Sequence, residues 1–460
     1  MTATGETNED VGLRDKATNP TYASVVGAWK RTSLREAGVS LIDCDHRTPT
    51  AADSGYPYVA IPQIKQGRLD LSHVRYISPA HFVEWTRKAK PQHHDVILSR
   101  RCNPGETAYV PAGIECALGQ NLVLLRSDTT MVFPPFLRWL VRGPDWWEQV
   151  NTFINVGAIF DSLKCADIPN FKLSLPPLAE QRTIAYILGT LDDKIELNRR
   201  MNETLEAIAR AVFKSWFVDF DPVCAKASGE PPESICRRLG LTPDLLAHFP
   251  DRLVDTEFGE IPEGWAVKPL DGIADYLNGL ALQKFPPEND SEWLPVIKIS
   301  QLKKGDSTGA DRASHKLKRE YIVDDGDVLF SWSGSLEVDI WCGGRGALNQ
   351  HLYKVTSANF PKWFYFYWTR HHLSHFQAVA AGKAVTMGHI QRKHLTEALC
   401  AVPPKPLMER LDGIVAPLLD KQIENRKESR TLGFMRDSLL PKLLSGELKS
   451  FSQTEMTEAV

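Results

Sequence analysis

The sequence predicts an α/β protein built by internal duplication: two globular mixed α/β domains separated by two long antiparallel coiled-coil helices, with pseudo-twofold symmetry. Three observations lead to this fold class. A set of strand-like motifs occurs twice in the same order, each set ends at a Pro-Pro pair, and each pair precedes a long amphipathic segment. A chain of 460 residues has enough material for more than one hydrophobic core.

The duplicated motifs are short, but their order is the same in both halves. Each half has an apolar run that ends in a Lys/Gly turn, then a second apolar run, then a polar triplet before a third run. The pairs are YPYVAIPQIKQGRLDLS from Tyr56 with WLPVIKISQLKKGDS from Trp293, DVILSRR from Asp95 with DVLFSWS from Asp327, and GQNLVLL from Gly119 with NQHLYKV from Asn349. This order predicts one domain over residues 20–160 and a second over 261–395.

Two Pro-Pro pairs mark the expected starts of the long helices. They occur in SLPPLAEQR and AVPPKPLMER, and proline is tolerated in a first helical turn because its missing N–H has no intrahelical partner there. The first helix is expected from residue 178 to the break at 220–222, and the second from 407 to 445–446. We assign spacer helix regions to 161–222 and 396–448, since a helix of about 40 residues spans roughly 60 Å.

Apolar residues recur along both helices with the spacing of a coiled-coil seam. The first seam contains Ile184, Leu188, Leu191, Ile195, Leu205, Ala209, Val212 and Trp216. The second contains Leu411, Ile414, Leu418, Leu432, Met435 and Leu439, with Lys421 and Glu428 interrupting its middle. The predicted helix-pair interface comprises Leu191, Asn198, Leu205, Val212, Leu418, Asn425, Leu432 and Leu439.

Asn198 and Asn425 occupy equivalent seam positions near the expected helix midpoints. In an antiparallel pair, equivalent residues meet only where the pseudo-twofold axis crosses, so these amides are expected to hydrogen-bond to each other and set the register. The alternative is that both amides face water at a polar interruption.

The remaining segments carry less order in their sequence. Residues 223–260 are rich in Pro, Gly and charge and are predicted to be a linker, with at most one short helix near LTPD at 241–244. Residues 1–19 and 449–460 are expected to be disordered tails.

Composition excludes several classes of protein. No stretch reaches the roughly 20 apolar residues of a membrane span, and the polar start MTATGETNEDVG does not resemble a signal peptide, so we expect a cytoplasmic protein. The eight cysteines are scattered without a C-x-x-C pair and are expected to be reduced. A net charge of -3 gives no overall attraction to nucleic acid, so a DNA-binding surface would have to be a local patch.

Catalytic motifs are missing where a DNA-acting enzyme would need them. The FPPF sequence at 133–136 lacks the polar residue that holds a target amine in amino-methyltransferases, and Gly382-Lys383-Ala384 lacks the hydroxyl of a phosphate-binding loop. His371, His372 and His375 have helical spacing without a third ligand or the Glu of H-E-x-x-H. We therefore predict no catalytic residue and no metal site.

Local charge favours binding instead. Residues 354–405 contain seven Lys or Arg residues against one acid. Cations neutralise phosphates, whereas Asn, Gln, Arg and Ser on loops can read base edges. The predicted DNA-binding residues are Lys65, Arg100, Arg101, Gln120, Asn121, Lys298, Gln301, Lys303, Lys304, Ser331, Ser333, Asn349, Gln350, His351, Lys383, Gln391 and Arg392. Any one of them can instead be an ordinary solvated loop residue.

A long segment, LPPLAEQRTIAYILGTLDDKIELNRRMNETLEAIARAVFKSWFVDFDPV at 175–223, resembles the central repeat of type I restriction-modification specificity subunits. IPEGWAVKPL from Ile261, DCDHRTP from Asp43 and GKAVTMGHIQRKHL from Gly382 are similar to other segments of that family. The polar residues in the second helix depart from the family's heptad pattern.

This resemblance implies that the two domains are target-recognition domains for a bipartite site in double-stranded DNA. It implies two modification (methyltransferase) subunits and separate restriction (motor-nuclease) subunits as partners. S-adenosylmethionine, ATP and Mg are expected on those partners, with no cofactor and no catalysis in this chain and no membrane association. A fused single-chain restriction enzyme would need the missing motifs. The competing hypothesis is a non-enzymatic coiled-coil adaptor with two interaction domains.

Overall fold

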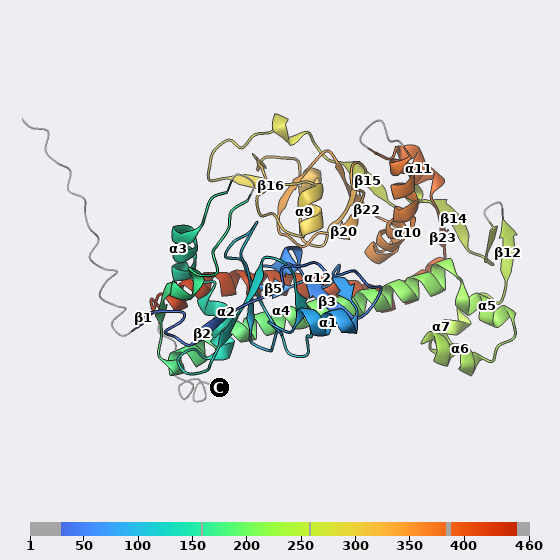
Figure 1. Cartoon of the computed structure of the whole chain (residues 1–460). Helices are drawn as coiled ribbons and strands as arrows, with labels where there is room; N and C mark the ends of the chain where they lie inside the picture. Colours follow the sequence, from blue (N-terminus) through green and yellow to red (C-terminus); the bar gives the residue numbers. More distant parts are fainter. Residues whose placement is uncertain (1–28, 158–159, 257–258, 383–387, 449–460) are drawn as a thin grey trace, which may run out of the picture. The chain divides into compact units, whose positions relative to one another are not determined.

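The structure, a computed structural model, describes residues 29–157, 160–256, 259–382 and 388–448. The chain divides into two compact units, with residues 1–192 and 434–460 in unit 1 and residues 193–433 in unit 2. Both predicted tails lie outside the described residues. The predicted fold class, two mixed α/β domains joined to two long helices, is confirmed, and Figure 1 shows the elements of each unit.

Unit 1 contains a four-stranded sheet beside a smaller three-stranded one. The larger sheet has the order β2-β10-β7-β8 and the smaller β6-β3-β9, in which β3 and β9 run parallel. β1 and β11 pair at the two ends of the repeat, and β4 and β5 form a hairpin. The strands are β1 (Lys30–Ser33), β2 (Val39–Asp43), β3 (Tyr56–Val59), β4 (Ile64–Lys65), β5 (Arg68–Leu69), β6 (Arg75–Ile77), β7 (Val96–Ser99), β8 (Thr107–Tyr109), β9 (Ala117–Leu118), β10 (Leu122–Ser127) and β11 (Lys172–Leu175).

Unit 2 repeats this topology. Its sheets have the orders β15-β22-β19-β20 and β17-β16-β21-β18, with β16 and β21 parallel, and β14 pairs with β23. A further hairpin joins β12 and β13. The strands are β12 (Leu253–Thr256), β13 (Gly259–Pro262), β14 (Ala266–Pro269), β15 (Asp275–Asn278), β16 (Trp293–Ile297), β17 (Arg312–Ser314), β18 (Ile322–Val323), β19 (Val328–Ser331), β20 (Val338–Ile340), β21 (Gly346–Leu348), β22 (Leu352–Thr356) and β23 (Leu399–Val402).

Each unit contains several short helices, and two long helices complete the described fold. Unit 1 contains α1 (Pro79–Trp85), α2 (Pro134–Leu140) and α3 (Pro144–Phe153), and unit 2 contains α5 (Asp221–Ala227), α6 (Pro232–Leu239), α7 (Pro243–Ala247), α8 (Leu270–Ile273), α9 (Ile299–Lys304), α10 (Lys362–Ala381) and α11 (Arg392–Glu397). The long helices are α4 (Leu178–Phe213, 36 residues), which ends in a π-turn at Lys214–Val218, and α12 (Lys405–Leu444, 40 residues).

The prediction of a linker at residues 223–260 is wrong, because α5, α6, α7 and the β12–β13 hairpin occupy it. Proline stands in the first turn of each of these helices, where it starts a helix rather than breaking one. Ile235, Leu245 and Phe249 are buried in the main core of unit 2. A segment rich in Pro and charge is therefore folded here because a few apolar residues anchor it.

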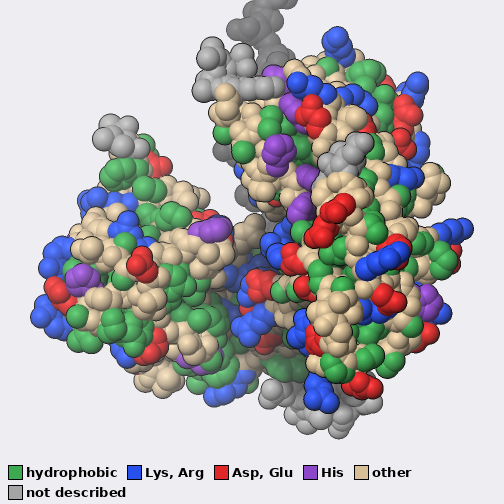
Figure 2. All heavy atoms as spheres, turned by 90° about the vertical axis from the view of Figure 1, so that its right-hand side faces the viewer, with side chains coloured by type: hydrophobic (Ala, Val, Ile, Leu, Met, Phe, Trp, Pro, Cys, Tyr) green, Lys and Arg blue, Asp and Glu red, His purple; other side chains and the backbone are tan. Residues whose placement is uncertain are grey.

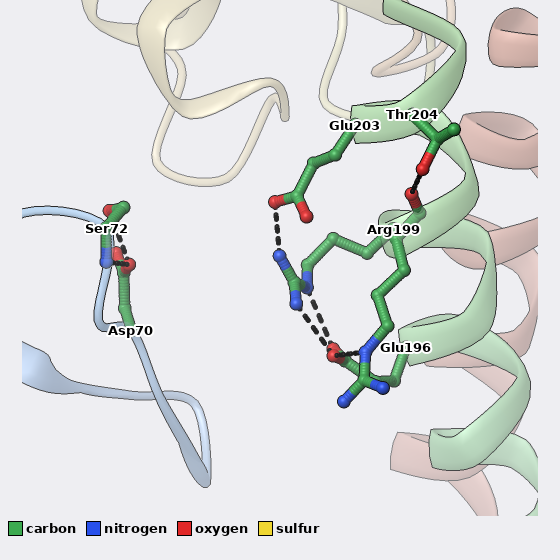
Figure 3. A network of polar contacts seen from close by, with 7 residues as sticks. Asp70, Ser72, Glu196, Arg199, Glu203 and Thr204 are labelled. Carbon is green, nitrogen blue, oxygen red and sulfur yellow. Dashed lines mark hydrogen bonds and ion pairs between the residues drawn. The ribbon is translucent and has the colours of Figure 1, made fainter. Parts of the chain in front are cut away.

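The outer face of α4 is held by ion pairs along the helix (Figure 3). Arg199 donates to Glu196 at 2.7 Å and also pairs with Glu203, and Arg200 donates to Glu196 at 2.8 Å. These i, i+3 and i, i+4 pairs support the helix locally, by roughly 0.2–0.5 kcal/mol each at such exposed positions. The face that carries them is polar, so the seam must lie elsewhere on the helix.

Candidate nucleic-acid interface

The strand registers align the two repeats residue by residue. Ser99 lies opposite Leu122 in unit 1, and Ser331 lies opposite Leu352 in unit 2. In the same way, Val59 lies beside Leu118 and Ile297 beside Leu348. The equivalent positions that follow are Asp43 and Asn278, Gln63 and Gln301, Arg100 and Trp332, Arg101 and Ser333, Gly119 and Asn349, Gln120 and Gln350, and Asn121 and His351.

Backbone hydrogen bonds at these positions are the same in both repeats. The Arg100 N–H donates to the Asn121 carbonyl at 2.9 Å, and the Trp332 N–H donates to the His351 carbonyl at 3.4 Å. The Gly119 N–H donates to the Val59 carbonyl, as the Asn349 N–H does to the carbonyl of Ile297. Each repeat thus brings the end of its third sheet strand (β7 or β19) against the turn before β10 or β22.

In unit 1 this site presents amide and guanidinium groups. Gln120 is exposed and its Nε2 donates to the Thr48 hydroxyl at 2.8 Å, while Asn121 holds the turn with a left-handed φ of 69°. Arg101 lies over the Phe160 ring at 5.5 Å. Arg100 is half-buried, and its Nε has no hydrogen-bond partner among the described residues. These side chains match acceptors on base edges and phosphates.

In unit 2 the equivalent site is aromatic and more fully bonded. The Trp332 Nε1 donates to the Asn278 side chain at 2.9 Å and to the Gln350 carbonyl at 3.2 Å. Ser333 Oγ lies 2.8 Å from His351 Nδ1, and the Gln350 amide lies 3.3 Å from His351 Nε2. Predicted residues Ser333, Gln350 and His351 are brought together here, and the His351 ring lies 6.0 Å from the ring of Trp332.

Three predicted base-reading residues have a structural role. The Gln301 side chain accepts from the Lys298 N–H at 3.3 Å and caps α9, as Gln63 does from Ala60 in unit 1. Ser331 is fully buried and donates to the Ser335 carbonyl at 2.8 Å. Asn349 is 3% exposed and accepts from the His351 N–H. These side-chain oxygens are used within the fold, and base contact by the three residues stays a prediction.

The sequence analysis missed Trp332 and Asn278. Trp332 lies inside the DVLFSWS motif but is not among the predicted residues, and no motif marks Asn278. The offset between the repeats was a usable signal, since it places Trp332 opposite Arg100.

The predicted phosphate-binding cations are mostly ion-paired within the fold. Lys65 pairs with Asp70, Lys298 with Asp311 and Lys304 with Asp306, while Lys303 donates to the Ser335 hydroxyl. Gln391 and Arg392 are exposed at the start of α11, where Arg392 also donates to the Tyr276 carbonyl, and Lys383 lies outside the described residues. Figure 2 shows a face on which Lys and Arg alternate with Asp and Glu. Exposed pairs of this kind are weak, so phosphates can compete for the cations.

One group of side chains has the composition of a metal site. The ligand atoms of Asp43, Cys44 and His46 lie within 4.8 Å of one another. However, Asp43 already pairs with His46 at 3.0 Å, and the buried Cys44 thiol donates to the Gly119 carbonyl at 3.1 Å. Burial, together with the charge of Asp43, raises the pKa of Cys44 to about 11, which disfavours the thiolate that a metal would need.

The histidines of α10 also have structural surroundings. The His372 Nε2 donates to the Leu399 carbonyl at 2.9 Å. Burial lowers the pKa of His372 to about 4, so the ring is neutral at physiological pH. His371 stacks edge-on against Trp368 beside it.

In unit 2, α4 and α12 pack antiparallel through a polar seam. Asn202 contacts Gln422 and Asn425, and Asn198 contacts Asn425 and Glu428, so α12 numbers rise as α4 numbers fall. Asn198 and Asn425 are 0% and 1% exposed, which rules out amides that face water. The predicted bond between their side chains is wrong: Asn198 donates to the Glu428 carboxylate at 2.7 Å, and Asn425 donates to Asn202 Oδ1 at 2.9 Å. Asn425 contacts both Asn198 and Asn202, which are one turn apart on α4, and its side chain donates to Asn202.

The predicted seam of α12 is shifted in part. Ile414 and Met435 are 40% and 45% exposed, whereas Leu419 and Arg436 are buried. Lys421 and Glu428 are exposed and do not interrupt the seam, whose middle contains Gln422 and Asn425. The other predicted interface residues, Leu191, Leu205, Val212, Leu418, Leu432 and Leu439, are half-buried.

In unit 1 the same two helices meet around a buried charge. Arg436 on α12 donates to Asp192 on α4 at 2.6 Å, and each side chain is 7% exposed. Arg138 on α2 lies 3.8 Å from the same carboxylate. Leu440 and Leu443 pack with Ile184 and Leu188 in the unit 1 core. In each unit, α4 and α12 are thus held together by side-chain contacts between residues of that unit.

No helix in the described ranges combines the length and the apolar character that a membrane crossing requires.

This duplicated framework, with one site at the end of β7 and another at the end of β19, is similar to known DNA-specificity proteins. Residues 45–207 match the type I restriction modification DNA specificity domain. A type I restriction enzyme specificity subunit of Methanocaldococcus jannaschii, MjaIX, is 27% identical over 77% of this chain and 77% of its own length. The HindI specificity subunit of Haemophilus influenzae is 24% identical over 76% of this chain and 86% of its own length.

A solved structure supports the fold. The S subunit of a type I restriction-modification system from M. genitalium superposes with a TM-score of 0.51 at 14% identity, covering 90% of this chain and 96% of that one. Over 76–77% of its length the chain is similar to the MjaIX and HindI type I restriction enzyme specificity subunits, and residues 45–207 match the family's DNA specificity domain.

Proposed function

We propose that this chain reads a bipartite site in double-stranded DNA for a type I restriction-modification enzyme, with one half-site read by each repeat. The observation that carries the proposal is the pair of equivalent strand-end sites, which share backbone hydrogen bonds and differ in their exposed side chains. Two different half-sites require the same backbone framework with different side chains at the ends of β7 and β19 and in the turns beside them.

The long helices supply the second part of the proposal. If α4 and α12 act as rods, their length sets the number of unread base pairs between the half-sites. The duplicated plan would also offer two modification subunits equivalent binding surfaces. Restriction subunits join this complex, and S-adenosylmethionine, ATP and Mg are used by the partner subunits rather than by this chain. Because its substrate is chromosomal or invading DNA, the complex would work in the cytoplasm.

The test is to express the full chain with the modification subunit of its own system in a host that lacks adenine methylation, and to map methylated bases. We expect one bipartite motif that disappears when the chain is omitted. Methylation without this chain, or a motif with a single continuous half, would contradict the proposal. The adaptor hypothesis predicts that methylation continues unchanged without it.

An exchange experiment tests the assignment of half-sites. The first repeat, bounded by the β1–β11 pair at residues 30–175, is replaced by the corresponding domain of a relative. We expect only one half of the methylated motif to change. A simultaneous change in both halves would mean that the repeats do not read independently.

A further inference from the structure

Arg100 has surroundings that differ from those of the other arginines near it. Arg47 pairs with Asp45 and Glu84, and Arg126 pairs with Asp95 at 2.6 Å. The Arg100 guanidinium forms no ion pair or hydrogen bond within the described part of the chain, although the residue is half-buried and its Nε is shielded from solvent. A partly buried cation without a partner is costly, and such sites are commonly functional.

The acid that could neutralise Arg100 is engaged elsewhere. Asp43 lies at the end of β2 in the same site, and its charge and that of Arg100 act in opposite directions on the pKa of the Cys44 thiol. The Asp43 carboxylate, however, accepts from the Cys44 N–H at 3.0 Å and pairs with His46 at 3.0 Å. Asp43 therefore does not neutralise the Arg100 guanidinium by an ion pair.

The backbone at Arg100 is fixed on both sides. Its N–H donates to the Asn121 carbonyl at 2.9 Å, and its carbonyl accepts from the Leu163 N–H at 2.8 Å. A held backbone lowers the entropy lost when a side chain binds, and it fixes where the guanidinium can reach. Arg101, by contrast, is exposed and lies over the Phe160 ring.

The equivalent position in the second repeat has no such group. Trp332 stands there, and its indole N–H is already bonded to Asn278 and to the Gln350 carbonyl. A guanidinium fork fits the O6 and N7 acceptors of guanine in the major groove, whereas adenine presents a donor beside its N7. An indole with its donor used cannot make that contact.

Resting on the proposed function, we infer that Arg100 reads a guanine in the first half-site, and that the second half-site is read without a guanidinium at the equivalent position. The difference between Arg100 and Trp332 is then a determinant of sequence preference within one framework.

The test measures binding by the complete modification complex built on the full chain. Duplexes carry the methylated site found for the wild type, with each base pair of both half-sites replaced in turn. We expect wild type to prefer guanine at one position of one half-site by roughly 5- to 150-fold over other bases. Arg100→Gln should reduce that preference to near one and leave the other positions unchanged, and Arg100→Lys should lose most of it while retaining more affinity.

Arg31→Gln is the matched control, since Arg31 is an exposed residue of β1 that pairs with Glu148, outside the strand-end site. It removes the same charge and should leave all base preferences as in wild type. Thermal melting of each variant verifies that unit 1 is folded.

Three outcomes would overturn the inference: unchanged discrimination in Arg100→Gln, an equal loss of affinity for every sequence, which marks a phosphate contact, or a loss that follows Arg101→Gln instead. If wild type has no preferred site at all, the proposed function itself fails. A clear wild-type site that ignores Arg100 refutes only the present inference.

Discussion

The two units hold the same pair of helices together by different chemistry. In unit 1 the polar seam residues are charged, with Asp192 and Arg436 buried in contact. In unit 2 the buried seam residues Asn198 and Asn425 are neutral amides, and their only charged partner among the described residues is the exposed Glu428. A buried charge becomes unfavourable when its partner is lost, whereas an amide can be replaced by an apolar side chain of similar size. The α4–α12 contact should therefore be sensitive to substitution of its buried charged residues in unit 1 and tolerant of substitution of its buried amides in unit 2.

The largest effect is expected from Asp192→Ala. It removes the buried carboxylate that Arg436 and the nearby Arg138 share, while Arg436 keeps its pair with the exposed Asp437, and we expect a loss of about 2–3 kcal/mol of stability in unit 1. Thermal and urea unfolding measure it. Asp193→Ala, at the exposed neighbouring position, should change stability by less than about 0.5 kcal/mol. Equal effects of the two substitutions would remove the contrast between charged and neutral seams.

Acid pH should weaken unit 2 through His372. Its folded pKa of about 4 lies below the ordinary value of 6.5, so the unfolded state binds more protons between these values. Stability is therefore full above about pH 6.5 and falls as the pH drops toward 4, by up to about 1.4 kcal/mol per pH unit.

His372→Gln isolates this effect, because the amide can still donate to the Leu399 carbonyl but does not titrate. Melting temperatures from pH 7 to pH 4 should fall less steeply in this variant than in wild type. His375→Gln, exposed on the same helix, is the control. A slope that is the same in all three proteins would show that His372 does not govern acid stability.

The smallest effect is expected from replacing Asn198 and Asn425 together with Leu. Asn198 Oδ1 is buried without a hydrogen-bond partner among the residues that the structure describes, so the change should raise the stability of unit 2 by about 1 kcal/mol, or about 2–4 °C in melting temperature. The amides that set the register are then lost, and methylation should spread to motifs with altered spacing between half-sites. A fall in stability would show that the amide bonds outweigh the cost of burying them.

Periodicity and internal repeats were enough to predict the fold class, the long helices and the burial of Asn198 and Asn425 between them. The seam of α12 was partly misread, because Ile414 and Met435 fit an apolar repeat while the structure buries Leu419 and Arg436. Hydropathy does not reveal that a cation can be buried when Asp192 lies opposite it, since the partner is distant in sequence.

The sequence by itself determined the duplicated α/β plan, because hydrophobic period, proline placement and motif order are local properties of the chain. Only the tertiary structure decided which polar residues are available to a ligand. Ser331, Asn349 and Gln301 match the pattern of base readers, and their side-chain oxygens form hydrogen bonds within the fold. Arg100 differs from them in one respect that no local pattern contains: its Nε has no hydrogen-bond partner in the described part of the chain. Hydrogen-bond satisfaction depends on residues far apart in sequence, and for that reason it is settled only when the chain is folded.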